Sequence, residues 1–447
     1  MTAAVAAAPA RRAPPVARGA AAALRIRERP DLVLLALALM HLTNAWRLPS
    51  IVHVLQPLRL GITSVVLAVV VFVLDRSPRR RLLDVPQVPV RLALALLAFM
   101  LISIPAGIYP SHSGSFVAKI AAPMVLLMLM LAASIRSTRD VEWFAFLNML
   151  GGAGYCIFLL FVLHTRRFAQ SQSLIFYDSN DVALMLVATI PSAAYFMSRG
   201  HGAAARLAAL LSLGLYIVVT VLTGSRGGFL GLAVMLGYLA SAYRGMSRSQ
   251  RVAGAAFVVI ALVTFGGARY LAKMGTILRP TQDYNWSGHS ERGRMEVWKR
   301  GLGYIAQRPF FGVGVDNFSR AEGYLSAGGR EAQARGLPYK WSVAHNSYLE
   351  TAAQSGVGSL LAFLALVGTT FQLLGRVVRR MLALPFVSRE LALAQMLTAA
   401  LIGFMVSAFF ISAEYFPYLY ALLGLSLGLA KVVLPREVAK RRQWRRA

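Results

Sequence analysis

The sequence predicts an all-α integral membrane protein with about twelve transmembrane helices and one large extracytoplasmic loop. Three observations predict this class. Hydrophobic residues make up 57% of the chain, whereas soluble domains contain about 45–50%. Apolar runs of roughly 20 residues, the length that crosses a bilayer core, recur along the sequence. The segments between these runs alternate between Lys- and Arg-rich and Lys- and Arg-poor composition.

The apolar runs define the expected spans. The least distinct boundary lies at Ser225–Gly227, where two runs nearly merge. The runs cover residues 31–46, 58–74, 90–108, 116–135, 141–163, 180–197, 205–224, 226–243, 251–272, 346–370, 389–412 and 415–434.

The basic residues predict the orientation. With the N-terminus in the cytoplasm, the two tails and five loops on that side hold about 28 Lys and Arg, and the short loops on the other side hold about 6. Cytoplasmic segments carry such an excess. Both termini are therefore expected in the cytoplasm. We therefore interpret the net charge of +29 mainly as a result of membrane topology and secondarily as a sign of phosphate binding. It does not indicate nucleic-acid binding here.

The chain divides into five segments. Residues 1–30, which are rich in Ala, Pro and Arg, predict a disordered cytoplasmic tail, and residues 435–447 predict a second basic tail. Helices 1–9 are expected within 31–272 and helices 10–12 within 345–434. The polar segment 273–344 between them holds about 11 Lys and Arg. Long loops cross a membrane regardless of charge, so this segment is expected on the extracytoplasmic side.

Part of this loop has helical periodicity. Met295, Trp298, Leu302 and Ile305 repeat at helical spacing. Pro309 and the glycines that follow it predict the end of the helix. We expect this helix to lie along the membrane surface with the face of Trp298 toward the lipid.

Ionisable residues gather at one end of the predicted spans. Charge at membrane depth is costly and usually faces a bundle interior or water, so the gathering predicts a cavity that opens outward. The alternative is that some of these side chains reach the interface separately. The residues are Arg47, Lys119, Asp181, Arg226, His345, Glu350 and Glu414. Arg47, Lys119 and Asp181 are candidates for substrate binding.

Two arginines stand in sequences suited to phosphate binding. Arg226 lies in Thr223-Gly224-Ser225-Arg226-Gly227-Gly228, where small residues allow a tight turn and leave room for a ligand. Arg294 stands one helical turn before Trp298. A guanidinium can form paired hydrogen bonds to a pyrophosphate. The alternative for each is an arginine among lipid headgroups, and Arg292 is a substitute candidate for the role of Arg294.

His345 precedes a predicted helix. Ser347 and Glu350 have capping-box spacing, so the helix is expected to start at Ser347 and Glu350 is expected to be structural. The positive end of the helix dipole favours a neutral imidazole, which can accept a proton from an attacking hydroxyl. The alternative is a loop histidine bonded to the backbone.

The sequence lacks the common motifs for metal, nucleotide and dinucleotide binding. The seven histidines show no HxxH or HExxH spacing, and no Walker loop, dinucleotide fingerprint or Asp-x-Asp pair is present. The single cysteine, Cys156, excludes an intramolecular disulfide. We therefore expect neither a metal nor a cofactor.

These residues resemble the bacterial O-antigen ligase family, within a wider group that includes O-antigen polymerases and protein O-oligosaccharyltransferases. The resemblance covers the whole architecture and three motifs: Ser225-Arg226-Gly227; Arg294-x-x-x-Trp298 followed by Pro309 and Gly312-x-Gly314; and His345-Asn346 followed by Gly356. The family pattern places Gly-x-x-Gly after the histidine, whereas this chain has Gly356-Val357-Gly358-Ser359 and lacks the final glycine.

The resemblance implies a fold like that of type C glycosyltransferases in the bacterial inner membrane, with its site in the periplasm. It implies metal-independent, inverting transfer of a glycan from undecaprenyl pyrophosphate to a sugar hydroxyl of the lipid A core, in lipopolysaccharide biosynthesis. Arg226 and Arg294 would hold the pyrophosphate, and His345 would activate the acceptor. A polymerase or a protein-modifying ligase would use the same chemistry. A transporter is the alternative from another class.

Overall fold

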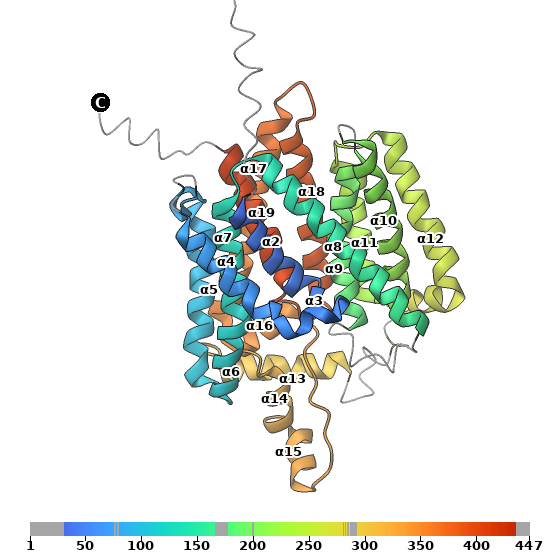
Figure 1. Ribbon diagram of the computed structural model, residues 1–447. Coiled ribbons are helices and arrows are strands. Elements are labelled where there is room, and N and C mark those ends of the chain that lie inside the picture. The colour runs from blue at the N-terminus through green and yellow to red at the C-terminus, as the bar shows by residue number, and fades with distance from the viewer. Residues whose placement is uncertain are drawn as a thin grey trace, which may run out of the picture.

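The structure is a computed structural model that describes residues 31–75, 77, 80–165, 178–198, 201–279, 281, 283, 286 and 293–434. Over these residues the regular elements are all helices (Figure 1). The two predicted tails, 1–30 and 435–447, lie outside the described residues, and so does Arg292.

Each predicted span corresponds to an apolar helix in the described chain. Eight helices are long and apolar enough to cross a membrane, judged by length and composition, and four apolar helices of 14–17 residues accompany them. The eight are α5 (Gln87–Ala106), α6 and α7 as one segment (Pro110–Ser134), α8 (Thr138–Thr165), α9 (Ser179–Met197), α10 (Ala203–Thr223), α12 (Arg248–Gly275), α17 (Val357–Leu382) and α18 (Arg389–Ala408). The four shorter ones are α2 (Leu32–Ala45), α4 (Leu60–Leu74), α11 (Arg226–Ala242) and α19 (Pro417–Val433).

The centre of the bundle is formed by α9 and α18, which pack against each other and against α11. Most residues of the apolar stretches of α9 and α18 are buried, 83% and 78%, against 11% in α12. At Gly231 of α11 a side chain would overlap Ser407 of α18, so glycine lets these two helices approach closely. The α12 helix stands at the outer edge of the bundle (Figure 1).

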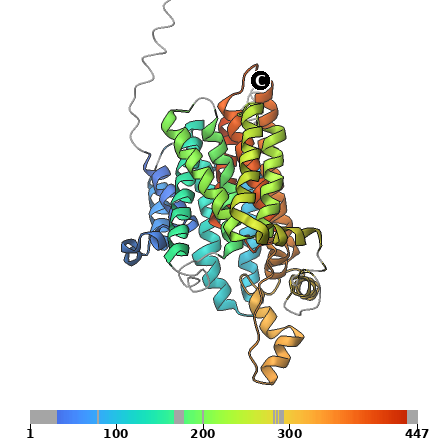
Figure 2. The same cartoon turned by 90° about the vertical axis from the view of Figure 1, so that its right-hand side faces the viewer.

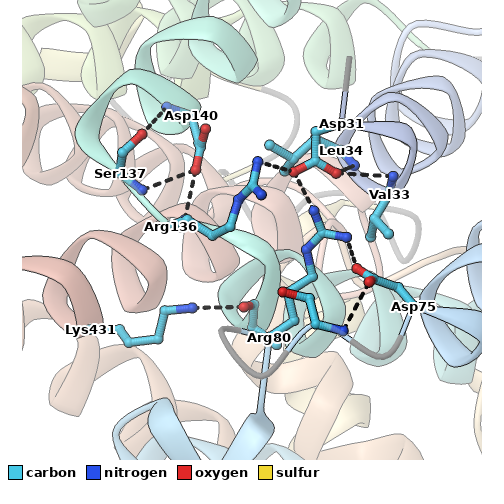
Figure 3. Close-up of polar contacts among 11 residues, drawn as sticks. Asp31, Val33, Leu34, Asp75, Arg80, Arg136, Ser137, Asp140 and Lys431 are labelled. Atoms are coloured by element: carbon cyan, nitrogen blue, oxygen red, sulfur yellow. Dashed lines mark hydrogen bonds and ion pairs between the residues drawn. The ribbon is translucent and has the colours of Figure 1, made fainter. Parts of the chain in front are cut away.

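At one end of the bundle, an ionic network connects the start of α2 with the loops that follow α4 and α7 (Figure 3). The Asp31 carboxylate caps α2 by accepting from the N–H groups of Val33 and Leu34. It also pairs with Arg136 at 2.6 Å and with Arg80, which bridges to Asp75 after α4. These arginines belong to the loops that the charge pattern assigns to the cytoplasm, and carboxylates here neutralise part of their charge.

Short helices cover the other end (Figure 2). The α13 helix (Arg294–Gln307) lies across the bundle, and α14 (Phe318–Tyr324) and α15 (Ala327–Ala334) project away from it. Two further short elements, α3 (Leu48–Ile51) and α16 (Ser347–Ser355), belong to the same end.

The predicted span at 346–370 is wrong in one respect, because it is two helices. Gly356 separates α16 from α17 with φ of 88°. A side chain at this position would overlap the carbonyl of Phe310, so the chain breaks here to let the loop segment pack closely. The α16 helix therefore packs against the loop segment 309–314, and α17 is the helix long enough to span the membrane.

The helix predicted in the loop is present as α13, and its buried stripe lies about one residue before the apolar face that was predicted to meet the lipid. Val297, Gly301 and Tyr304 are buried, whereas Leu302 is 60% exposed. The buried stripe packs against α16 rather than lipid. Periodicity alone could not distinguish the two faces. Apolar residues stand both on the side of α13 that packs against protein and on its exposed side.

Candidate functional site

The loop motifs meet through backbone hydrogen bonds. The glycine segment 309–314 lies along α16, where the N–H of Val313 donates to the oxygen of Ala353 (2.8 Å) and that of Gly314 to the oxygen of Gln354 (2.9 Å). Gly312 and Gly314 have φ of 66° and 98°, values that only glycine adopts readily. Side chains at Gly312 would overlap α16. The glycines therefore bring the segment after α13 against the helix that follows His345.

His345 lies in the junction between α13 and α16. Its own N–H donates to Ser412 Oγ at 3.1 Å. The carbonyl of the preceding Ala344 accepts from Trp298 Nε1 at 2.7 Å. His345 has φ of 48°, a left-handed conformation that is uncommon outside glycine and concentrates at functional sites. Contacts on both sides thus hold the histidine in a strained geometry.

The predicted helix start at Ser347 is correct, but the predicted capping box is wrong. Asn346 is the cap, and its Oδ1 accepts from the N–H groups of Tyr348 and Leu349, both at 3.0 Å. The Ser347 hydroxyl instead donates to the oxygen of Ile411 (2.7 Å) and accepts from the N–H of Ala413 (2.8 Å). It therefore anchors α16 to the loop 409–416 rather than closing the helix end.

Burial keeps the imidazole neutral. It lowers the pKa of His345 to about 4, and the positive charge of Arg294 acts in the same direction while Asp178 opposes it. The direction of this shift agrees with the neutral ring that the sequence predicts, and its largest cause is desolvation.

Arg226 and Arg294 line one cavity of about 260 Å³, which we call the Arg226 cavity. Arg226 Nη1 donates to Thr276 Oγ1 at 2.9 Å, and the guanidinium also pairs with Asp283, which is buried. Burial lowers the pKa of Arg294, and the charge of Arg226 lowers it further. Two guanidinium groups converge on a space shared with Trp286 and Phe410, an arrangement suited to a multiply charged anion.

A second cavity of about 280 Å³ is also lined by residues of the loop 409–416, and we call it the Lys119 cavity. Phe410 lines the Arg226 cavity and Ser412 lines the Lys119 cavity, two residues apart. Arg47, Lys119 and Asp316 contribute charged side chains to the Lys119 cavity. Ser412, which accepts the N–H of His345, therefore joins this cavity to the histidine.

Asp316 and Arg47 share an unusual backbone with His345. Their φ values are 57° and 51°, so three of the four non-glycine residues with positive φ in the described chain belong to this site. Asp316 Oδ2 is 2.7 Å from His112 Nε2, and the N–H of Asp316 donates to Gln354 Oε1 at 2.9 Å. The Gln354 side chain thus connects α16 to the Lys119 cavity.

Two buried carboxylates lie behind the histidine loop. Glu350 of α16 is contacted by Ser412 Oγ and accepts from Gln354 Nε2 at 3.0 Å. Burial raises the pKa of Glu350 to about 7, and burial together with Glu350 raises the pKa of Glu414 well above its usual range. Glu350 thus positions Ser412, which in turn holds the His345 backbone. Glu350 therefore has a structural role, but it is the support of Ser412 rather than the predicted closure of a capping box with Ser347.

Asp181 has a structural explanation. It forms a reciprocal cap with Asp178 at the start of α9, where Asp178 Oδ1 accepts from the N–H of Asp181 (2.9 Å) and Asp181 Oδ2 accepts from the N–H of Asp178 (3.2 Å). Asp178 is the residue whose charge acts on both Arg294 and His345.

Sequence reasoning missed Asp178, Asp283, Asp316 and Ser412. Asp316 carried a usable signal, because it stands two residues after Gly314 of the Gly312-x-Gly314 motif. Asp178 carried another, since Asp178-Ser-Asn-Asp181 reads as a helix cap. Asp283 and Ser412 are ordinary loop residues until the chain folds. Within the described residues, no group of three His, Cys, Asp or Glu side chains is arranged to hold a metal ion.

One comparison with known proteins covers part of the region that forms the site. A family model described as O-antigen ligase matches residues 207–364, which include Arg226, Arg294 and His345. A protein of Haemophilus influenzae, named only as an uncharacterized protein, is 24% identical over 167 residues. That alignment covers 35% of this chain and 40% of the relative, so the chain spans about two-fifths of the length of this relative.

Proposed function

Because the chain belongs to the O-antigen ligase family, which its residues 207–364 match, we propose that it is an O-antigen ligase. It takes a glycan from undecaprenyl pyrophosphate and attaches it to a sugar hydroxyl of the lipid A core, on the periplasmic face of the inner membrane. The observation that carries this proposal is the pair of arginines that line one cavity, one of which, Arg294, is close enough to His345 for its charge to lower the pKa of that ring. The activity needs a phosphate-binding group and a base, and the site has both.

The Arg226 cavity is the proposed site of the lipid-linked donor. Its two guanidinium groups would bind the pyrophosphate and stabilise the charge that develops as this group leaves. Trp286 and Phe410 contribute aromatic surface to the same cavity, suited to a sugar ring or the first part of the lipid. Since pyrophosphate is already a good leaving group, charge stabilisation and positioning supply most of the catalysis.

The Lys119 cavity is the proposed site of the acceptor. Arg47 and Lys119 bring positive charge, which suits an acceptor that carries phosphate or carboxylate groups. Asp316 in the same cavity can accept hydrogen bonds from sugar hydroxyls. Residues of the loop 409–416 line both cavities, and the backbone of His345 is bonded to Ser412 of the same loop.

The proposed reaction is a single displacement. The acceptor hydroxyl oxygen forms a bond to the anomeric carbon of the glycan while the bond from that carbon to the pyrophosphate oxygen breaks. The hydroxyl proton passes to the neutral His345 imidazole, and undecaprenyl pyrophosphate departs with its charge held by Arg226 and Arg294. Attack opposite the leaving group inverts the anomeric centre.

An in vitro transfer assay tests the proposal. Purified protein is supplied with undecaprenyl-pyrophosphate-linked glycan and a chelator, with lipid A-core in one reaction and no acceptor in the other. Glycan on lipid A-core is the expected product. Longer lipid-linked chains without acceptor would identify a polymerase, and transfer to added protein would identify a protein O-oligosaccharyltransferase. No product under any condition would overturn the enzyme assignment and favour a transporter.

A further inference from the structure

A polar cavity of about 340 Å³ lies at the end of the bundle away from His345, and we call it the Arg244 cavity. The α9 helix places it there, because α9 begins at Asp178 beside the site and ends at this cavity. Its lining comes from the segments after α9 and α11 and from the starts of α12 and α18. These residues include Ser198, His201, Arg244, Ser247, Gln250, Ser388 and Arg389.

The Arg244 cavity is electropositive. Arg244 and Arg389 supply two guanidinium groups, and no lining residue is acidic. One carboxylate approaches from outside the lining, since Glu142 Oε2 is 3.7 Å from Arg389 Nη1 and Glu142 Oε1 is 4.0 Å from His201 Nε2. The hydroxyl of Tyr195 also donates to Glu142, so this carboxylate offsets part of the positive charge. No carboxylate is paired with Arg244 among the residues that the structure describes. The N-terminal ends of α12 and α18 also meet here, and their partial positive charges add to the field.

An apolar groove of a further 340 Å³ or so continues from this cavity, and we call it the α12 groove. It runs between α12 and helices α9, α10 and α11, and it is lined almost wholly by aliphatic and aromatic side chains such as Leu213, Leu236 and Phe257. Met246 and Gln250 line both spaces. A single molecule could therefore occupy the polar cavity and the groove together.

The α12 groove is open to the bilayer side of the bundle. The α12 helix is the outermost helix on this side (Figure 1), and few of its residues are buried. At Gly254, which lines the groove, no atom lies within 4 Å of the position a Cβ would take. Arg251 lines the groove close to the shared residues. The groove is thus apolar along its length and basic at its mouth.

We propose that the Arg244 cavity and the α12 groove together bind one anionic phospholipid, with the phosphate in the cavity and an acyl chain in the groove. Free phosphate would use the arginines but not the groove, and a zwitterionic lipid would gain less from an electropositive cavity. A phosphate headgroup matches the Arg244 cavity, and the hydrocarbon chain attached to it matches the adjoining α12 groove. This site is separate from the proposed transferase site and does not depend on it.

Native mass spectrometry of the purified full chain tests the proposal. The protein is titrated in detergent with phosphatidylglycerol or with phosphatidylcholine of the same acyl chains. One phosphatidylglycerol is expected to remain bound per chain, with phosphatidylcholine retained much less. Replacing both arginines, Arg244→Gln with Arg389→Gln, should weaken phosphatidylglycerol binding by about 30-fold, since each basic residue near a lipid phosphate contributes severalfold.

Two further variants separate the headgroup from the chain. Gly254→Phe fills the open part of the groove and should weaken phosphatidylglycerol binding while both arginines remain. Arg379→Gln with Arg380→Gln, two exposed residues of the last turn of α17, is the matched control and should bind as the wild type does. Equal binding of the two lipids, or wild-type binding by the Arg244/Arg389 variant, would overturn the proposal.

A competition experiment with inorganic phosphate tests whether the Arg244 cavity binds a free anion instead of a phospholipid headgroup. At millimolar concentration it should displace little phosphatidylglycerol, because it cannot occupy the groove. Full displacement by phosphate together with unaltered binding by Gly254→Phe would show a simple anion site and would also overturn the lipid assignment.

Discussion

The indole N–H of Trp298 donates to the carbonyl oxygen of Ala344 at 2.7 Å, directly before His345. On the other side of the same residue, the N–H of His345 donates to Ser412 Oγ at 3.1 Å. The loop helix α13 and the loop 409–416 therefore hold the histidine between them. The proposed base is positioned by two segments that lie more than a hundred residues apart in the chain.

Trp298→Phe removes this hydrogen bond and keeps an aromatic ring beside Trp286 and Phe409, whose ring centroids lie 5.2 and 5.5 Å away. Transfer activity should fall about fivefold, the effect of one net hydrogen bond, with the protein still inserted and monodisperse. Trp341→Phe is the control, since that ring packs on Tyr324 in the outer part of the loop. Equal activity of both variants in the transfer assay would mean that the Trp298 hydrogen bond does not position the histidine.

His345→Ala should lower the transfer rate by about 10²–10⁴-fold, the usual contribution of a general base. The pH profile gives a second readout. The base is active when neutral, and the pKa of His345 is lowered to about 4, so activity should persist at pH 5 and decline only as the pH falls toward 4. An acidic limb near pH 6.5 would contradict the buried, neutral state of the ring.

Lysine should replace Arg226 and Arg294 poorly. Lysine keeps the charge but lacks the planar fork of donors that binds two phosphate oxygens at once. Each substitution should lower kcat/KM for the lipid-linked donor by about 10–100-fold, the range for a hydrogen bond to a charged group. Arg335→Lys, in an exposed ion pair of α15, should have wild-type kinetics. Wild-type kinetics for both site variants would indicate that these arginines only contact lipid headgroups.

Asp283→Asn should lower the KM for the donor. In the structure the Asp283 carboxylate pairs with Arg226, so an incoming pyrophosphate must compete with it. Removal of the charge takes away this competitor for the Arg226 guanidinium and should reduce KM severalfold, with kcat nearly unchanged. A fall in kcat instead would mean that Asp283 orients Arg226 for the reaction.

Glu350→Gln should change how stability depends on pH. The pKa of Glu350 is raised to about 7 from an ordinary value of 4.5, so the folded protein holds this proton more tightly than the unfolded chain does. Wild-type stability should therefore fall as the pH rises from about 4.5 to about 7. Thermal unfolding in detergent should show a smaller fall for Glu350→Gln. Glu331→Gln, on the exposed face of α15, should follow the wild type.

Much of the fold could be predicted from hydropathy. Burying an apolar run of about 20 residues in lipid is a local property of that run, so all twelve segments could be located before any contact was known, including the separation at Ser225–Gly227. The helix α13 was predictable for the same reason, from local periodicity. Arg226, Arg294 and His345 could be nominated because small residues, helix ends and polar residues next to spans have local signatures.

The rest was decided by tertiary packing. The break at Gly356, the buried face of α13 and the cap by Asn346 depend on what packs against each segment, and no local pattern encodes the neighbour. Asp283 and Ser412 acquire their roles only in the folded chain, where Asp283 meets Arg226 and Ser412 meets His345. The same reason applies to His345, because the burial and the charge of Arg294 that lower its pKa come from tertiary packing and could not be read from the sequence.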